Sequence, residues 1–173
     1  MPSTYSNNIG LELIATGEKS GEWGSITNGN LEILDAAIHG NITVNLTGEG
    51  ASYDLETNQW LENSTDVYEG TYKVITLTGG DDPSPASRIT INIVPSTSEK
   101  MYFIRTDSLS HGVEISQGTG VSKVNIDNGD IKIIYCDGSN NVFDLSGLTM
   151  STINATGGSI NGVTVGATKP STG

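Results

Sequence analysis

The sequence predicts a mainly β protein: a β-sandwich of jelly-roll-like arrangement with one short N-terminal helix and an extended C-terminal tail. Short segments in which apolar and polar residues alternate recur through the middle of the chain, as in half-buried antiparallel strands. Hydrophobic residues make up 35% of the chain and charged residues 16%, both low for a globular domain. Glycine, serine, threonine and asparagine take their place, a mixture that suits short strands joined by tight turns.

The chain is expected to have three parts. Residues 1–47 form an N-terminal strand and helix segment, residues 48–145 form the β-sandwich, and residues 146–173 form the extended tail. A chain of 173 residues is long enough for one hydrophobic core, and the polar C-terminal part is expected to lie outside it.

The N-terminal part contains a short strand and then the helix. Leu11, Leu13 and Ala15 lie at alternate positions and predict the strand. The helix is expected over residues 30–39, where three apolar residues recur at helical spacing: Leu31, Leu34 and Ile38. Either Asn28 or Asn30 can cap the start of this helix, and Gly40 can end it.

Two residues beside this helix have alternative interpretations. Trp23 stands between glycines in the sequence, and its ring is expected to pack over the helix; a tryptophan that stacks on a ligand is the alternative. His39 lies in the last turn, where the helix dipole favours a cation, but an ordinary exposed histidine is favoured.

The middle of the chain reads as a series of short strands. Seven segments are candidates: 41–47, 71–77, 88–94, 101–106, 112–116, 122–126 and 130–136. Ile89, Ile91 and Ile93 share one face of their segment, as a half-buried strand requires. Asn128-Gly129 and Asp137-Gly138 are strong tight-turn signals. This spacing of strands predicts the sandwich but not the order of its strands.

Residues 48–70 are acidic and polar, with few candidates for the core, and are expected to cross the surface. Tyr53 and Trp60 in this segment are candidates for stacking on a glycan or docking on a neighbouring chain. The alternative is that the segment packs onto its own sandwich.

The motifs of common enzymes are missing from the sequence, so no catalytic, cofactor-binding or metal-binding residue is predicted and the protein is not expected to be an enzyme. His39 and His111 are the only histidines, and the adjacency of Ser110 to His111 does not make a nucleophile and base pair. Asp81-Asp82 and residues 127–130 offer carboxylates to Ca²⁺ but lack the ligand spacing of a calcium loop, so turn residues are favoured.

Charge and composition exclude several partners. The formal net charge of -12 argues against nucleic acid and anionic membranes, because the eight lysines and arginines are scattered singly. No apolar run is long enough to span a bilayer, and the N-terminus lacks the pattern of a signal peptide, so assembly in the cytoplasm is expected. Cys136, the only cysteine, is expected to be a buried strand residue.

The tail has too few apolar residues to fold alone, yet between 158 and 173 its only charge is Lys169. Other copies of the chain are the natural place to bury the apolar side chains of the tail. The candidate interface residues are Ile153, Ile160, Val163 and Val165.

Three stretches resemble structural proteins of tailed bacteriophages, notably phages of cyanobacteria. The tail is similar to the phage-fibre pattern "I-N-G-T-x-I-G-A-T-x-P-S-T-G". The N-terminus is similar to the pattern "L-x-L-x-x-x-G-x-x-x-G-x-W-G-x-x-T-N-x-N-L", matched here by Leu11, Gly17, Gly21, Trp23, Gly24, Thr27, Asn28, Asn30 and Leu31. Residues 135–138, Tyr-Cys-Asp-Gly, also look like the end of that family's domain.

The resemblance implies a non-enzymatic, homotrimeric virion protein with an intertwined tail, most simply a short fibre or fibre adaptor on the phage tail or neck. It implies other virion proteins as partners, with Trp23, Leu31, Leu34 and Ile38 as residues of virion attachment or helix packing. Fibres of this kind usually continue beyond such a tail, so the end at Gly173 favours a short connector. A capsid decoration protein and a module that binds a host surface glycan are the alternatives; Glu62 and Asp66 could then join the two aromatic residues.

Overall fold

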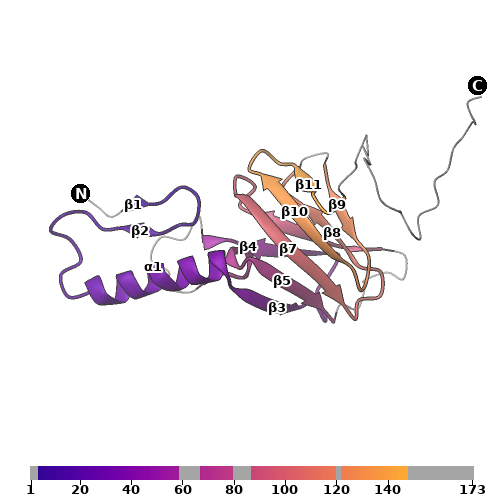
Figure 1. Cartoon of the computed structure of the whole chain (residues 1–173), viewed down its shortest axis with the longest axis horizontal. Helices are drawn as coiled ribbons and strands as arrows, with labels where there is room; N and C mark the ends of the chain where they lie inside the picture. Colours follow the sequence, from indigo (N-terminus) through magenta and orange to yellow (C-terminus); the bar gives the residue numbers. More distant parts are fainter. Residues whose placement is uncertain (1–3, 59–66, 80–86, 120–121, 148–173) are drawn as a thin grey trace, which may run out of the picture.

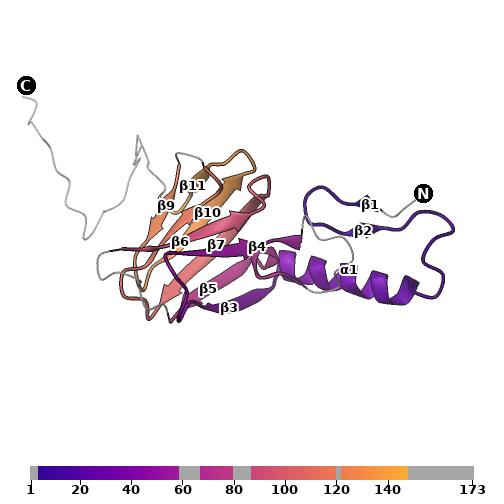
Figure 2. The same cartoon turned by 180° about the vertical axis from the view of Figure 1, so that it is seen from behind.

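The computed structural model describes residues 4–58, 67–79, 87–119 and 122–147 of the chain. This part forms an elongated molecule with two larger β-sheets at one end and a helix with a small two-stranded sheet at the other (Figure 1). The view from behind shows the same separation (Figure 2). The predicted mainly β fold with an N-terminal helix is confirmed.

The two larger sheets contain nine strands of the described chain. The five-stranded sheet has the order β11-β10-β7-β5-β3, with β3 (Asn41–Asn45), β5 (Val74–Thr78), β7 (Glu99–Asp107), β10 (Ile131–Asp137) and β11 (Val142–Asp144). The four-stranded sheet has the order β4-β6-β8-β9, with β4 (Ser52–Glu56), β6 (Ile89–Val94), β8 (Val113–Ser116) and β9 (Val124–Ile126). A short 3-10 helix, η2 (Glu69–Thr71), precedes β5.

From β3 to β8 the chain alternates between the two sheets. Each time the chain re-enters a sheet, the new strand pairs in parallel with the previous strand of that sheet. Strands β3, β5 and β7 are therefore parallel to one another, and so are β4, β6 and β8. The last three strands pair antiparallel: β9 with β8, β10 with β7, and β11 with β10. Both sheets are therefore mixed.

The expected jelly-roll-like arrangement is wrong, because a jelly roll is built from antiparallel strands. Between β3 and β8 the connections join strands of different sheets, so consecutive strands do not pair as hairpins. Glycine and asparagine indicate where a strand ends, but they do not indicate which sheet the next strand enters.

One hydrophobic core lies between the sheets and receives inward-facing side chains from both. Its buried members include Val44, Leu46, Leu55, Ile75, Leu77, Ile89, Ile91, Ile93, Tyr102, Ile104, Val113, Ile115, Val124, Ile126, Ile134, Cys136 and Val142. The prediction that Ile89, Ile91 and Ile93 share a buried face is confirmed, and so is the burial of Cys136. The sandwich is thus held together mainly by removal of apolar surface from water.

Each of the seven predicted strands overlaps a strand of the structure. Strand β4 lies in the segment expected to cross the surface, and β11 was not predicted. Strand β3 belongs to the five-stranded sheet, so the sheets begin before residue 48. Residues 128–129 and 137–138 lie in tight connections, as predicted. The connection at residues 137–138 joins β10 to β11, which pair as a hairpin.

The N-terminal module consists of a two-stranded hairpin and the helix. Strands β1 (Thr4–Tyr5) and β2 (Glu12–Leu13) pair antiparallel, so the strand expected from residue 11 to 15 is shorter. Helix α1 (Trp23–Ile38) packs beside them through Ile26 and Ile33. The side chain of Asn30 joins the two parts: its Nδ2 donates to the Glu12 carbonyl, and its Oδ1 accepts from the Glu12 N–H, both at 2.9 Å.

The helix begins at Trp23 rather than near residue 30, so the predicted start is wrong. Its N-cap is Glu22, with no side-chain capping hydrogen bond, and Asn30 lies inside the helix. Gly24 and Gly29 have low helix propensity, but contacts with the hairpin outweigh this preference. The end is as predicted, because the Gly40 N–H donates to the carbonyls of residues 35 and 36.

We expect Asn30→Ala to weaken the docking of the hairpin on α1, because the substitution removes both hydrogen bonds to Glu12. The free energy of local opening should fall by about 1–3 kcal/mol. Hydrogen–deuterium exchange at the Glu12 amide measures this change. Asn28→Ala, at an exposed position of the same helix, is the matched control. Equal protection of Glu12 in the two variants would contradict the role of Asn30.

Candidate functional site

Helix α1 exposes apolar side chains along one face. Trp23, Leu31 and Ile38 are between 56% and 61% exposed, and Leu34 is half-buried. Successive spacings of eight, three and four residues place these four positions on one side of the helix. We call them the helix stripe. Trp23 is the first residue of the helix and does not pack over it, so that expectation is wrong.

A second apolar surface covers the outer face of the five-stranded sheet. Side chains alternate along a strand, so the neighbours of buried residues point outward. Eight outward apolar side chains come from β5, β7, β10, β11 and the residue after β11: Val74, Met101, Phe103, Ile131, Ile133, Tyr135, Phe143 and Leu145. We call this surface the sheet patch.

Strand pairing places the members of the sheet patch side by side. Ile133 lies opposite Phe103, and Phe103 lies opposite Val74 on the next strand. On the other side, the Leu145 N–H donates to the Ile133 carbonyl at 2.8 Å, which extends the pairing beyond β11. These residues form one apolar row across four chain segments.

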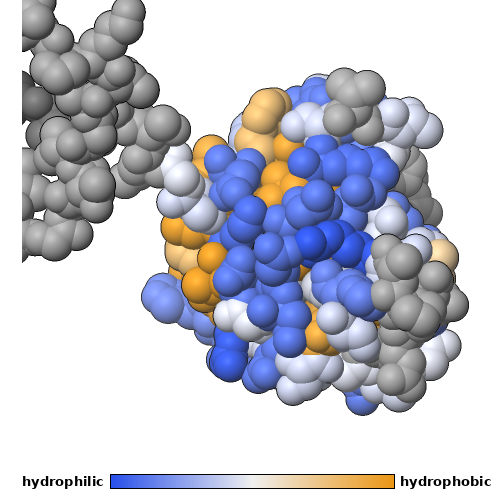
Figure 3. Space-filling model, turned by 90° about the vertical axis from the view of Figure 1, so that its right-hand side faces the viewer, coloured by the Kyte–Doolittle hydropathy of each residue, from blue (hydrophilic) through white to orange (hydrophobic). Residues whose placement is uncertain are grey.

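A second row runs beside the first. Tyr135 lies opposite Met101 on β7 and opposite Phe143 on β11. The rings of Tyr135 and Phe143 are stacked, with 6.2 Å between their centroids. Four patch residues, including Met101 and Phe143, are between 38% and 61% exposed. Figure 3 shows apolar surface gathered along one side of the molecule, next to mainly polar surface.

The outer face of the four-stranded sheet is different. Its outward side chains are mainly polar and include Ser52, Asp54, Glu56, Thr90, Asn92, Glu114 and Asn125. This is the ordinary alternation of a sheet with one buried and one solvated face. The sheet patch is therefore a property of one sheet and not of the sandwich in general.

Tyr53 lies at the edge strand β4 and packs partly against the core. Its hydroxyl donates to Glu69 Oε2 at 2.5 Å, and burial, followed by this hydrogen bond, raises the pKa of Tyr53. This placement favours packing onto the protein's own sandwich over stacking on a glycan. Trp60, Glu62 and Asp66 lie outside the described residues.

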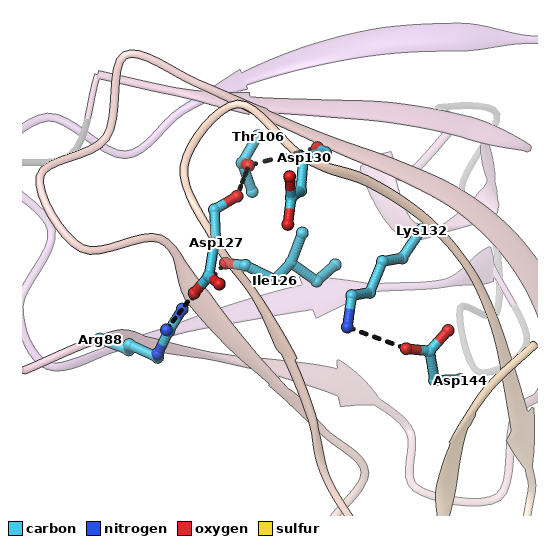
Figure 4. A network of polar contacts seen from close by, with 7 residues as sticks. All are labelled: Arg88, Thr106, Ile126, Asp127, Asp130, Lys132 and Asp144. Carbon is cyan, nitrogen blue, oxygen red and sulfur yellow. Dashed lines mark hydrogen bonds and ion pairs between the residues drawn. The ribbon is translucent and has the colours of Figure 1, made fainter. Parts of the chain in front are cut away.

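The candidate carboxylates between β9 and β10 form a turn that ties the sheets together (Figure 4). The Asp130 N–H donates to the Asp127 carbonyl at 3.0 Å, which closes the turn. Thr106 Oγ1 donates to the Asp127 carbonyl at 2.5 Å, and Arg88 pairs with the Asp127 carboxylate and donates to the Ile126 carbonyl at 3.0 Å. The favoured reading as turn residues is supported, because Asp127 is engaged within the fold.

A buried polar cluster lies between β7 and η2. Lys100 Nζ donates to the Gly70 carbonyl at 2.9 Å and to the Thr71 carbonyl, and it lies 5.0 Å from the centre of the Tyr102 ring. Tyr102 donates its hydroxyl hydrogen to the same Gly70 carbonyl at 2.8 Å. Burial, and secondarily the charge of Lys73, lowers the pKa of Lys100 to about 7. The cluster fixes η2 on the sheet.

Other candidate reactive groups are dispersed or buried. His39 follows α1 and His111 precedes β8, and both are exposed. Burial raises the pKa of the Cys136 thiol to about 12, which leaves it protonated at neutral pH. Within the described ranges, no group of three or more histidine, cysteine, aspartate or glutamate residues could hold a metal ion. No helix in the described part of the chain is long and apolar enough to cross a membrane.

Comparisons of the chain with protein-family models, curated proteins and solved structures found no match. The resemblance to phage structural proteins thus stays a prediction based on the two sequence patterns. The predicted interface residues Ile153, Ile160, Val163 and Val165 lie outside the described residues. The four residues predicted for attachment or helix packing all lie on α1 and make up the helix stripe, and their role stays a prediction.

The sequence contained a signal for the sheet patch that the strand analysis missed. Residues 101–104 read Met-Tyr-Phe-Ile, and residues 133–136 read Ile-Ile-Tyr-Cys, so both faces of β7 and β10 carry large apolar or aromatic side chains. Continuous apolar runs of this kind are typical of strands that are covered on both faces. The core covers one face, and the other face is the patch.

We expect the stability of the protein to rise between about pH 7 and pH 10 because of Lys100. The folded chain releases the Lys100 proton near pH 7, whereas the unfolded chain keeps it up to about pH 10.5. The unfolded state binds more protons in this window, so the free energy of unfolding increases with pH. Lys100→Met should lack this increase, which is on the order of a few kcal/mol.

Urea unfolding of both proteins at several pH values measures the effect. Lys123→Met is the matched control, because Lys123 is an exposed lysine paired with Glu114. It should retain the pH dependence of the natural sequence. Parallel pH profiles for the natural sequence and Lys100→Met would sink the idea that Lys100 titrates in this range.

Proposed function

We propose that this protein is a non-enzymatic structural component of a tailed-phage virion, a short homotrimeric fibre or fibre adaptor on the tail or neck. The observation that carries the proposal is the helix stripe on a module that projects from the sandwich (Figure 2). That module includes the segment whose sequence resembles the N-termini of phage structural proteins.

The helix stripe suits attachment to another virion protein. Trp23, Leu31 and Ile38 present large apolar side chains to solvent, whereas Ile26 and Ile33 already dock α1 on its hairpin. Burial of such side chains at a protein interface is favourable, and exposed aromatic residues often carry much of the binding energy. Three of the four side chains of the stripe are largely exposed, so they are available to a partner.

The polar groups of the described chain support a structural role. Lys100 and Tyr102 fix η2, Arg88 and Asp127 fix a turn, and Asn30 fixes the hairpin. Each of these side chains satisfies backbone or side-chain groups of the fold itself. A rigid scaffold with internally satisfied polar groups is what a mechanical part of a particle needs.

In the proposed homotrimer, the tail holds the three copies together. Its apolar residues are proposed to contact those of the two other copies: Ile153, Ile160, Val163 and Val165. Intertwining of this kind couples assembly to folding, because the tail alone has little to bury. The proposed location is the virion, after assembly in the host cytoplasm.

We expect the purified full-length chain to have a solution mass of three copies of 18.1 kDa, measured by light scattering. A chain that ends at Leu145 should fall toward the monomer, because it lacks the proposed trimerisation tail. Circular dichroism of the shortened chain checks that the sheets remain folded. A full-length monomer at all concentrations would contradict the homotrimer and favour a decoration protein that assembles only on a capsid.

Location on the particle is tested separately. Antibodies against the sandwich should label the tail or neck of intact virions in immunogold electron microscopy. Label over the whole head would favour capsid decoration, and virions without the protein would overturn a structural role in the particle.

A further inference from the structure

We propose that the sheet patch is the surface through which the sandwiches of neighbouring copies pack against one another. The inference rests on the homotrimer proposed above and names its interface. The sequence predicted no role for the residues of the sheet patch, and here they form the contact between copies. The helix stripe stays free to bind a different partner.

The patch is continuous, unlike the single exposed apolar residues that are common on protein surfaces. Its eight apolar side chains are contiguous across β5, β7, β10 and β11. Soluble monomers rarely expose contiguous apolar patches larger than a few hundred Å². The outer face of the other sheet, which is mainly polar, gives the internal comparison. A partner that covers one sheet and not the other explains this difference.

The composition of the patch matches the centre of a protein interface. Phe103, Tyr135 and Phe143 supply three aromatic rings, and Met101 supplies a flexible thioether. Aromatic residues and methionine are enriched at interface centres, where charged residues are depleted. None of the eight patch side chains carries a charge at neutral pH.

The charge of the protein restricts where two copies can meet, and the patch satisfies this restriction. Each chain has a formal net charge of -12, so two copies repel unless they meet through a surface free of acidic side chains. Two acids at the border of the patch are already engaged: Asp107 pairs with Arg105 at 3.0 Å, and Glu99 accepts from the Tyr135 hydroxyl at 2.5 Å.

The course of the chain also points to a second copy. Leu145 belongs to the patch, and residues 148–173, which carry the proposed trimerisation tail, follow almost directly. A tail that winds with its copies about a threefold axis must leave each subunit on the side that faces this axis. The last described residues leave the sheet along the edge of β10, beside the patch: the Leu145 N–H donates to the Ile133 carbonyl, and the Ile133 N–H donates to Ser146 Oγ at 2.8 Å.

The test substitutes the two patch residues whose side chains are most accessible without a role in the core. Phe143→Ser combined with Ile131→Ser in the full chain removes apolar area from the patch, since both side chains are exposed. We expect trimer formation to weaken about tenfold or more, as interface anchors are lost. Sedimentation equilibrium over a range of protein concentrations measures the association.

The matched control is Leu31→Ser combined with Ile38→Ser in the helix stripe. These residues are also exposed and apolar, so the control removes comparable surface at another place. It should remain a trimer of unchanged stability. Resistance of the buried Cys136 thiol to labelling, together with circular dichroism, verifies that both variants are folded.

Photo-crosslinking is a second measurement, and it detects the interface in the intact assembly. Benzoylphenylalanine in place of Phe143 should crosslink to another copy upon irradiation, whereas the same group in place of Asn125, on the outer face of the four-stranded sheet, should not. Crosslinks from position 143 to another copy support the interface even if the serine variant fails to fold.

The outcomes separate the interface from the homotrimer. A natural chain that is trimeric, with a patch variant that is equally trimeric and no crosslink from position 143, overturns the interface while the homotrimer stands. Dissociation of the helix-stripe variant alone also overturns it and assigns the interface to α1. A natural chain that stays monomeric overturns the homotrimer and the interface together.

Discussion

Burial of isoleucine, leucine and valine side chains between two sheets is the interaction on which the rest of the described fold depends. The chain alternates between the sheets from β3 to β8, so each new pair of strands extends the same core. Ile75 and Leu77 of one sheet and Ile91 of the other belong to one buried cluster. The inward side chains alone satisfy the need for a core, so the apolar side chains on the outer face require a separate explanation.

Polar side chains stabilise particular segments that surround this core. Lys100 holds η2, Arg88 holds the turn before β10, and Asn30 holds the hairpin on the helix. Each of these contacts fixes one local segment: η2 on its sheet, the turn after β9, and the hairpin on α1. Apolar burial gives the molecule its stability, and these hydrogen bonds give it a defined shape.

The strands could be predicted because their periodicity is local, as in Ile89-Thr-Ile-Asn-Ile93, and the hairpin at Asp137-Gly138 could be predicted from turn chemistry. The parallel pairing could not be predicted, since nothing local distinguishes a turn within a sheet from a connection between sheets. The helix start was missed because Asn28 and Asn30 are good capping residues, whereas Asn30 lies inside the helix and its side chain bonds to Glu12 of the hairpin instead. Of the candidate site, the positions of Leu31, Leu34 and Ile38 on the helix follow from their local spacing, whereas the sheet patch depends on pairing between distant strands and was not predicted.

The position of β7 makes it the link between the parallel and antiparallel halves of its sheet, with β5 on one side and β10 on the other. Since β10 and β11 come last among the described strands, the edge of β7 stays uncovered on a growing chain until nearly all of the sandwich has been synthesised. The five-stranded sheet can therefore be completed only after β10 and β11 have been synthesised.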